Sequence, residues 1–142
     1  MTKVLLSLHV LAAILAIGPV AVAASMFPAV ARRGATTEVR VLHRICNVYA
    51  LVGIAVPLFG FTLANVMHVL GSPWLIASII LTALAAAVLG LLILPAQRTM
   101  LTTAEVSPKA TARLGMLTGC FNLLWATVTV LMIIRPGSTT GA

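Results

Sequence analysis

The sequence predicts an all-α integral membrane protein: a single domain over residues 1–142 that forms an antiparallel bundle of four transmembrane helices. The chain is 61% hydrophobic and only 8% charged, whereas soluble domains carry roughly 25% charged residues. Four apolar stretches, at 4–30, 45–70, 74–96 and 112–134, are each long enough to cross a bilayer, which takes about 20 residues of helix. Helices are expected because backbone groups in lipid must be hydrogen-bonded within the segment.

The first stretch, 4–30, has two interpretations. Its beginning, MTK followed by an apolar run and then AVAAS, resembles a signal peptide with a small-residue cleavage site. The apolar run continues, however, through MFPAVA to Arg32 and Arg33, which is typical of an anchor that stays in the membrane. We therefore expect a first membrane-spanning helix here, and a cleaved signal peptide is the alternative.

The second and third stretches, 45–70 and 74–96, are joined only by the connection HVLGSPW. This short connection predicts that the two helices are antiparallel neighbours, with Gly71 ending one and Pro73 near the first turn of the next. Trp74 is expected at the membrane–water interface. The fourth stretch follows Ser107-Pro108, a helix-start signal, and residues 135–142 are expected to form a flexible tail.

Basic residues predict the orientation of the bundle. Two of the connections hold seven of the nine Lys and Arg residues, namely Arg32, Arg33, Arg40, Arg44, Arg98, Lys109 and Arg113. Because loops rich in Lys and Arg stay in the cytoplasm, both termini are expected outside (N-out, C-out) in a bacterial plasma membrane. The net charge of +7 therefore reports topology, and the expected partner is the lipid bilayer, not nucleic acid.

Small residues predict which helix faces point inward, since membrane helices associate through close packing of such residues. The four stripes at helical spacing are Ala12, Ala16, Pro19 and Ala23; Cys46, Ala50, Gly53, Pro57, Gly60 and Ala64; Ser78, Thr82, Ala86 and Gly90; and Gly115, Gly119, Asn122, Ala126 and Thr129. His9 continues the first stripe and His68 the second. Pro19 and Pro57 are expected to kink their helices.

His9 and His68 are the candidate ligands, and Asn65 lies at nearly the same predicted depth as His9. An ionisable side chain inside a membrane span indicates a functional site by default, although a neutral imidazole can instead hydrogen-bond a neighbouring helix. His9, His68 and Asn65 are the expected cofactor-binding residues. Met67 adds a thioether beside the imidazoles, so His9, His68 and Met67 are the candidate ligands for a metal ion such as copper.

Other polar residues have structural interpretations. His43 lies between Arg40 and Arg44, as expected of a basic cluster that meets anionic lipid headgroups. Asn122 is expected to hydrogen-bond a neighbouring helix, and Cys46 to be a small core residue. The four stretches contain no Asp or Glu, which disfavours a proton pump. Motifs of hydrolases and phosphoryl-transfer enzymes are absent.

The segments LHVLAAILAIGP, MFPAVARR and HRICNVYALVGIAVPLFG resemble the first two helices of the CopD/HemJ-like four-helix membrane proteins. Within that group the chain is most similar to families of unknown function of actinobacterial type. The resemblance implies haem b bound in the bundle, with His9 as an axial ligand. The segment WLIASIILTALAAAVLGLLILPAQR lacks the Lys and His that the group's protoporphyrinogen oxidases carry.

Three functions follow as hypotheses. The first is binding of haem b, or of a metal ion, through His9 with help from His68, since imidazoles on facing helices are able to ligate haem. The second is a cofactor-free accessory subunit of a larger membrane complex or homo-oligomer, held by its small-residue faces. The third is a protoporphyrinogen oxidase-like enzyme. The sequence leaves open whether any catalytic activity exists.

Overall fold

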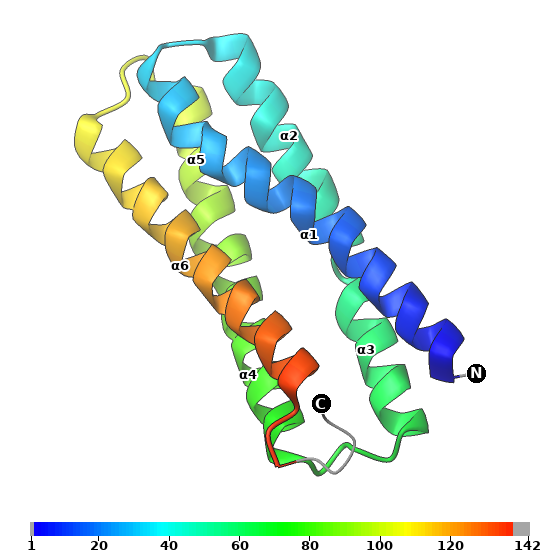
Figure 1. Ribbon diagram of the computed structural model, residues 1–142. Helices are drawn as coiled ribbons and strands as arrows, with labels where there is room; N and C mark the ends of the chain where they lie inside the picture. The colour runs from blue at the N-terminus through cyan, green and yellow to red at the C-terminus, as the bar shows by residue number, and fades with distance from the viewer. Residues whose placement is uncertain (1, 138–142) are drawn as a thin grey trace.

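The computed structural model describes residues 2–137, and this part of the chain is built from helices (Figure 1). The elements are α1 (Thr2–Arg32), α2 (Thr36–Val52), α3 (Ala55–Val66), α4 (Pro73–Ala87), the π-helical segment η1 (Val88–Ile93), α5 (Leu94–Thr102) and α6 (Pro108–Ile134). They form four helices that are long and apolar enough to cross a membrane: Thr2–Arg32, Thr36–Val66, Pro73–Thr102 and Pro108–Ile134. Residues 138–142 of the predicted tail lie outside the described range.

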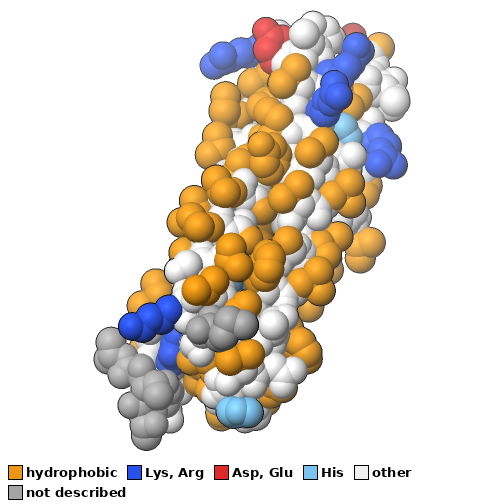
Figure 2. All heavy atoms as spheres, turned by 90° about the vertical axis from the view of Figure 1, so that its right-hand side faces the viewer, with side chains coloured by type: hydrophobic (Ala, Val, Ile, Leu, Met, Phe, Trp, Pro, Cys, Tyr) orange, Lys and Arg blue, Asp and Glu red, His pale blue; other side chains and the backbone are white. Residues whose placement is uncertain are grey.

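The four long helices run up and down, so α1 begins and α6 ends at the same end of the bundle as the α3–α4 connection (Figure 1). We call the other end, which holds the α1–α2 turn and the α5–α6 connection, the charged end. Figure 2 shows most Lys and Arg side chains gathered at that end, and hydrophobic side chains over the face below it. The all-helical fold and its four candidate spans confirm this part of the prediction.

The larger hydrophobic cluster includes the charged end, and a smaller one, formed by Ala64, Trp74 and Leu75, lies at the opposite end. Helix α1 packs on α2, α3 and α6, and it contributes the buried residues from Ala16 to Ala31. Toward the opposite end, α3 packs mainly on α1, whereas α4 packs mainly on α6. The expectation that the second and third spans are neighbours holds at the charged end, where α2 packs on α5. Toward the opposite end the two spans diverge, because α3 and α4 pack mainly on different helices.

The charged connections are mostly helical. Helix α1 extends to Arg32 and α2 begins at Thr36, so the first connection is a tight turn in which Gly34 adopts a positive φ of 70°. Helix α5 continues to Thr102, beyond the predicted end at residue 96. Helix α6 begins as predicted: Ser107 is its N-cap and accepts a hydrogen bond from the Ala110 N–H at 3.1 Å. Because α2 and α5 extend this far, Arg40, Arg44 and Arg98 are held on helices.

The second span is interrupted between Val52 and Ala55, four residues before Pro57. Proline has no N–H to donate, so the carbonyl of the residue four positions earlier, Gly53, loses its helical partner. The Gly53 carbonyl instead accepts from the Val56 N–H at 3.1 Å. Pro57 therefore disrupts the second span as predicted. The disruption lies four residues before the proline, where a short non-helical turn at Gly53 and Ile54 divides α2 from α3.

The predicted inward faces hold for α1 and fail for α6. In α1, Ala16 and Ala23 are buried as expected. In α6 the buried residues are Thr111, Leu114, Thr118, Phe121 and Val128, while Gly119, Ala126 and Thr129 are exposed. Helix α6 is apolar around its circumference, so small residues indicate its inward face only weakly, and larger side chains fill the space toward its neighbours.

In the third span, Ser78 of the predicted stripe is buried as expected, whereas Ala86 and Gly90 are exposed. Around the π-helical segment the buried residues include Ala85, Leu89, Ile93 and Gln97, which are spaced four apart. A regular α-helix has 3.6 residues per turn, so this spacing would rotate steadily away from the core. The π-helical segment Val88–Ile93 has more residues per turn, and it keeps these four side chains on one face.

Candidate functional site

His9 is a buried side chain at the contact between α1 and α3, with about 9% of its surface exposed. Its Nδ1–H donates to the Val56 carbonyl oxygen at 3.0 Å. A carbonyl only accepts hydrogen bonds, so this contact fixes the proton on Nδ1 and leaves the lone pair on Nε2. An imidazole held by one nitrogen with the other free is the arrangement that ligating histidines commonly show.

Gly60 makes the position of His9 possible. A Cβ at Gly60 would lie 2.8 Å from His9 Cε1 and 3.3 Å from its Nδ1, closer than carbon atoms pack. The imidazole therefore lies directly against the backbone of α3, one turn beyond Val56. The small-residue stripe predicted both Gly60 and His9 on facing surfaces, and the structure brings them into contact.

The other predicted ligands lie at the far end of α3. His68 is exposed and has a positive φ of 57°, two residues after α3 ends at Val66. Eight residues separate it from Gly60, which is about 12 Å along a helix axis. Asn65 is exposed and Met67 is half-buried in the same segment. A single ion bound by both imidazoles would require α3 to move relative to α1.

His9 offers one imidazole, and the other predicted ligands do not join it. Residues 2–137 contain no group of three or more His, Cys, Asp and Glu side chains placed to hold a metal ion. Protein metal sites for zinc or copper usually take three or four such ligands. Haem carries its own four nitrogen ligands and needs one axial side chain. His9 Nε2 makes no hydrogen bond to the described residues, and it lies beside α3, 3.6 Å from the place that a Gly60 Cβ would take.

A second buried polar group lies near the charged end, where α2 meets α5. His43 Nδ1 donates to Gln97 Oε1 at 3.0 Å, and Gln97 Nε2 contacts Cys46 Sγ at 3.6 Å. Gln97 and Cys46 are fully buried. The core position of Cys46 agrees with the prediction. Gln97 lies on α5, whereas the sequence predicts it in the connection after residue 96. The spacing of four residues between Ile93 and Gln97 is the sequence signal that could have placed Gln97 on the helix. The three side chains fix the rotation of α2 against α5.

Polar contacts also join α1 to α6. Asn122 Nδ2 donates to Ser25 Oγ at 3.1 Å, which confirms Asn122 as an interhelical hydrogen-bond partner. Its Oδ1 is buried and has no partner among the described residues. Nearer the charged end, Arg32 Nε donates to Thr111 Oγ1 at 3.3 Å. These contacts hold two helices that are far apart in the sequence.

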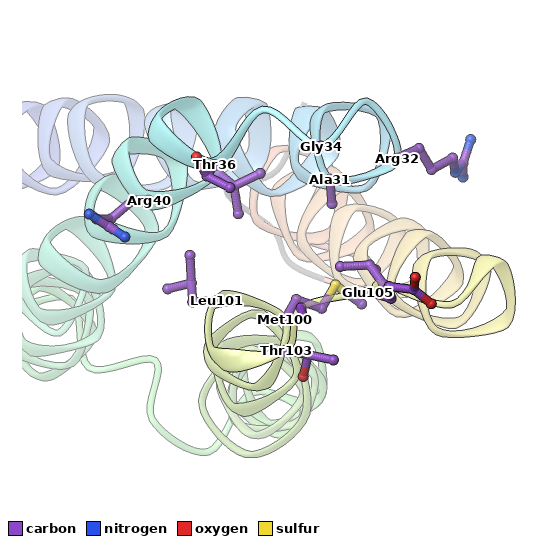
Figure 3. Close-up of a pocket in the computed structure, with 12 residues that line it drawn as sticks. Ala31, Arg32, Gly34, Thr36, Arg40, Met100, Leu101, Thr103 and Glu105 are labelled. Atoms are coloured by element: carbon purple, nitrogen blue, oxygen red, sulfur yellow. The ribbon is translucent and has the colours of Figure 1, made fainter.

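A cavity of about 390 Å³ opens at the charged end between the α1–α2 turn and the end of α5. Figure 3 shows Arg32 and Arg40 at opposite sides of it, with Ala31, Met100 and Leu101 between them. Glu105 lies on the side of Arg32 (Figure 3). The charged groups do not converge on a common point, so the cavity lacks the polar arrangement that orients a ligand.

No protein-family model, no curated protein sequence and no solved structure matches this chain. The resemblance to the CopD/HemJ-like proteins therefore stays a prediction. Two features of the molecule bear on its function: the residues around His9 and the distribution of charge.

Proposed function

We propose that this protein spans a bacterial plasma membrane four times, with both termini outside, and binds haem b through His9. The observation that carries the proposal is the hydrogen bond from His9 Nδ1 to the Val56 carbonyl, which leaves Nε2 as a free ligand atom inside the bundle. Bound haem would supply one-electron redox chemistry. His9 would act as the axial ligand of the haem. The Val56 carbonyl would orient the imidazole ring of His9, and Gly60 would leave room for that imidazole beside α3.

The charge distribution supports the orientation. Seven Lys and Arg side chains belong to the charged end, whereas Lys3 and Arg135 are the only ones near the termini. The positive-inside rule then puts the charged end in the cytoplasm. A cysteine introduced at Gly71 should react with a membrane-impermeant maleimide added to intact cells, and one introduced at Gly34 should react only after the cells are opened. The reverse pattern would contradict the orientation.

Haem binding is tested by the absorption spectrum of protein purified in mild detergent from cells supplied with a haem precursor. We expect a Soret band that shifts on reduction and that His9→Gly abolishes. Added imidazole should restore the band in His9→Gly, because the small ligand occupies the space of the deleted side chain. Rescue separates loss of a ligand from loss of the fold.

His68→Ala serves as the matched control for the ligand assignment. We expect this variant to keep the Soret band, since His68 lies at the far end of α3 and is exposed. Loss of the band in His68→Ala would show that α3 moves to bring a second axial ligand to the haem. A colourless wild-type protein, with haem available during expression, would contradict the proposal.

A second candidate function is that of an accessory subunit in a larger membrane complex. It is favoured by the exposed small residues Gly119 and Ala126, which lie on one face of α6. Such surfaces are used for helix association in membranes. Native gel electrophoresis of solubilised membranes would show a complex much larger than 14.8 kDa, which Gly119→Leu should dissociate.

A further inference from the structure

We propose that the outward side of α2 binds one anionic phospholipid, with the lipid phosphate at Arg44 and an acyl chain in the apolar groove below it. The inference rests on the membrane insertion and orientation proposed above, and it is independent of haem. The occupant is identified by charge complementarity: Arg44 is the one charged residue in the lining of a groove whose other residues are Val41, Ile45, Val48 and Tyr49.

The groove has a volume of about 220 Å³ and is lined by Val41, Arg44, Ile45, Val48 and Tyr49. These residues follow a spacing of three and four, which places them on one face of the helix. Val41 and Val48 are 52% and 46% exposed, so this face looks away from the bundle and toward lipid. From the first to the last residue the groove extends about 12 Å along the axis, enough for part of an acyl chain.

The side of α2 that carries the charge faces outward. Arg40 and Arg44 lie one turn apart on the same side of α2. The hydrogen bond between His43 and Gln97 lies on the side of α2 that faces α5, and it favours the rotation that leaves Arg44 outward. Arg guanidinium groups bind phosphate with paired, charge-assisted hydrogen bonds, and basic groups beside the membrane attract anionic lipid.

The acidic residues of this end do not neutralise the site. Glu38 lies in the first turn of α2, six residues before Arg44, or about 9 Å along the axis. Glu105 lies beyond the end of α5, on the side of the cavity away from Arg40 (Figure 3). Figure 2 likewise shows acidic side chains at the extreme of the charged end, with Lys and Arg side chains beside and below them. The groove therefore meets a net positive surface.

The test is native mass spectrometry of the full chain in detergent, titrated with phosphatidylglycerol or with phosphatidylcholine. We expect one phosphatidylglycerol molecule to bind at least tenfold more tightly than phosphatidylcholine. Arg44→Gln should weaken phosphatidylglycerol binding about tenfold, the loss expected for one charge-assisted hydrogen bond. Val48→Trp, which fills the groove and changes no charge, should weaken it as well.

Arg33→Gln is the matched control, because it removes one positive charge from the same end but away from the groove. It should leave phosphatidylglycerol binding within twofold of wild type. Equal losses in Arg33→Gln and Arg44→Gln, or equal binding of the two lipids by wild type, would overturn the proposal. Because Arg44 does not contact His9, Arg44→Gln should lose phosphatidylglycerol binding and keep the Soret band. That result would show that the lipid site and the haem site are independent of each other.

Discussion

Single residues decide how closely α1 approaches α3. His9 packs against Gly60, where a Cβ would lie only 2.8 Å from Cε1, and it donates to a main-chain carbonyl one turn away. An unpartnered imidazole N–H in an apolar environment would be costly. Position 60 therefore sets whether the polar group of His9 has a partner at all.

We expect Gly60→Ala to destabilise the protein by about 1–3 kcal/mol, because the added methyl group displaces the imidazole from Val56. Thermal unfolding in detergent, followed by circular dichroism, measures the loss. Gly119→Ala is the matched control, since no heavy atom lies within 4 Å of the place that its added Cβ would take and alanine favours helix. Equal stability of the two variants would mean that His9 is not packed on Gly60.

The buried side chain of Gln97 contributes to stability through its contacts with His43 and Cys46. We expect Gln97→Leu to lower the free energy of unfolding by about 1 kcal/mol, since His43 and Cys46 lose their shared partner. Thr99→Val, on the exposed side of the same helix, should change it by less than about 0.5 kcal/mol. Thermal unfolding of both variants is the measurement, and a stabilising Gln97→Leu would show that the buried contacts contribute nothing.

At the scale of elements, the sequence was sufficient to predict four helices but not how each is rotated. Length and hydropathy locate a membrane helix, and Ser107 and Pro73 mark helix starts by local chemistry. Rotation depends on a contrast between inward and outward faces, and that contrast is weak when lipid is as apolar as the core. This is why Ala16 was placed correctly, whereas Gly119 and Gly90 were not.

The same reasoning explains what was found and missed at the candidate site. His9 stands out because an imidazole is rare in an apolar run. The residues that position it are Val56, which acts through its backbone and carries no side-chain signal, and Gly60, one of several small residues in the stripe. Gln97 was missed because the helix was expected to end before it.

The π-helical segment gives a prediction at this scale. Deleting Gly90 should leave the four buried residues of this face at i, i+4, i+7 and i+11, which is the spacing of one face of a regular α-helix. We therefore expect the deletion to return the segment to α-helix with Gln97 still beside Cys46, and to lower the free energy of unfolding by less than the about 1 kcal/mol of Gln97→Leu. Gly90→Ala keeps the residue count and meets no atom within 4 Å, so it should unfold at the wild-type temperature. Thermal unfolding of the variants is the measurement, and a deletion variant less stable than Gln97→Leu would contradict this role.

On the scale of the whole molecule, the chain is two helical hairpins that meet along α1–α6 and α2–α5. The α3–α4 connection joins them covalently, and Ala64 of α3 packs with Trp74 and Leu75 of α4 beside it, but α3 packs mainly on α1 and α4 mainly on α6. The contacts that hold the hairpins together include the bonds from Asn122 to Ser25 and from His43 to Gln97. The covalent link at Gly71 is therefore not needed once the protein has folded.

We expect a protease site inserted at Gly71 to be cleaved in the folded protein without separating the two halves. Size-exclusion chromatography in detergent, followed by denaturing electrophoresis, should show both fragments in one peak at the wild-type elution volume. Adding Asn122→Leu and Gln97→Leu to the cleaved protein should promote dissociation. Fragments that separate immediately after cleavage would show that the hairpins depend on the connection.

The contact of His9 with Val56 also has a genetic consequence. Because the acceptor is a main-chain oxygen, every residue type at position 56 supplies it, so the hydrogen bond does not restrict which side chain stands there. The contact restricts position 60 instead, where only glycine leaves room for the imidazole. Among chains that share this fold, histidine at position 9 should be inherited together with glycine at position 60, while chains that have lost the histidine should be free to vary there.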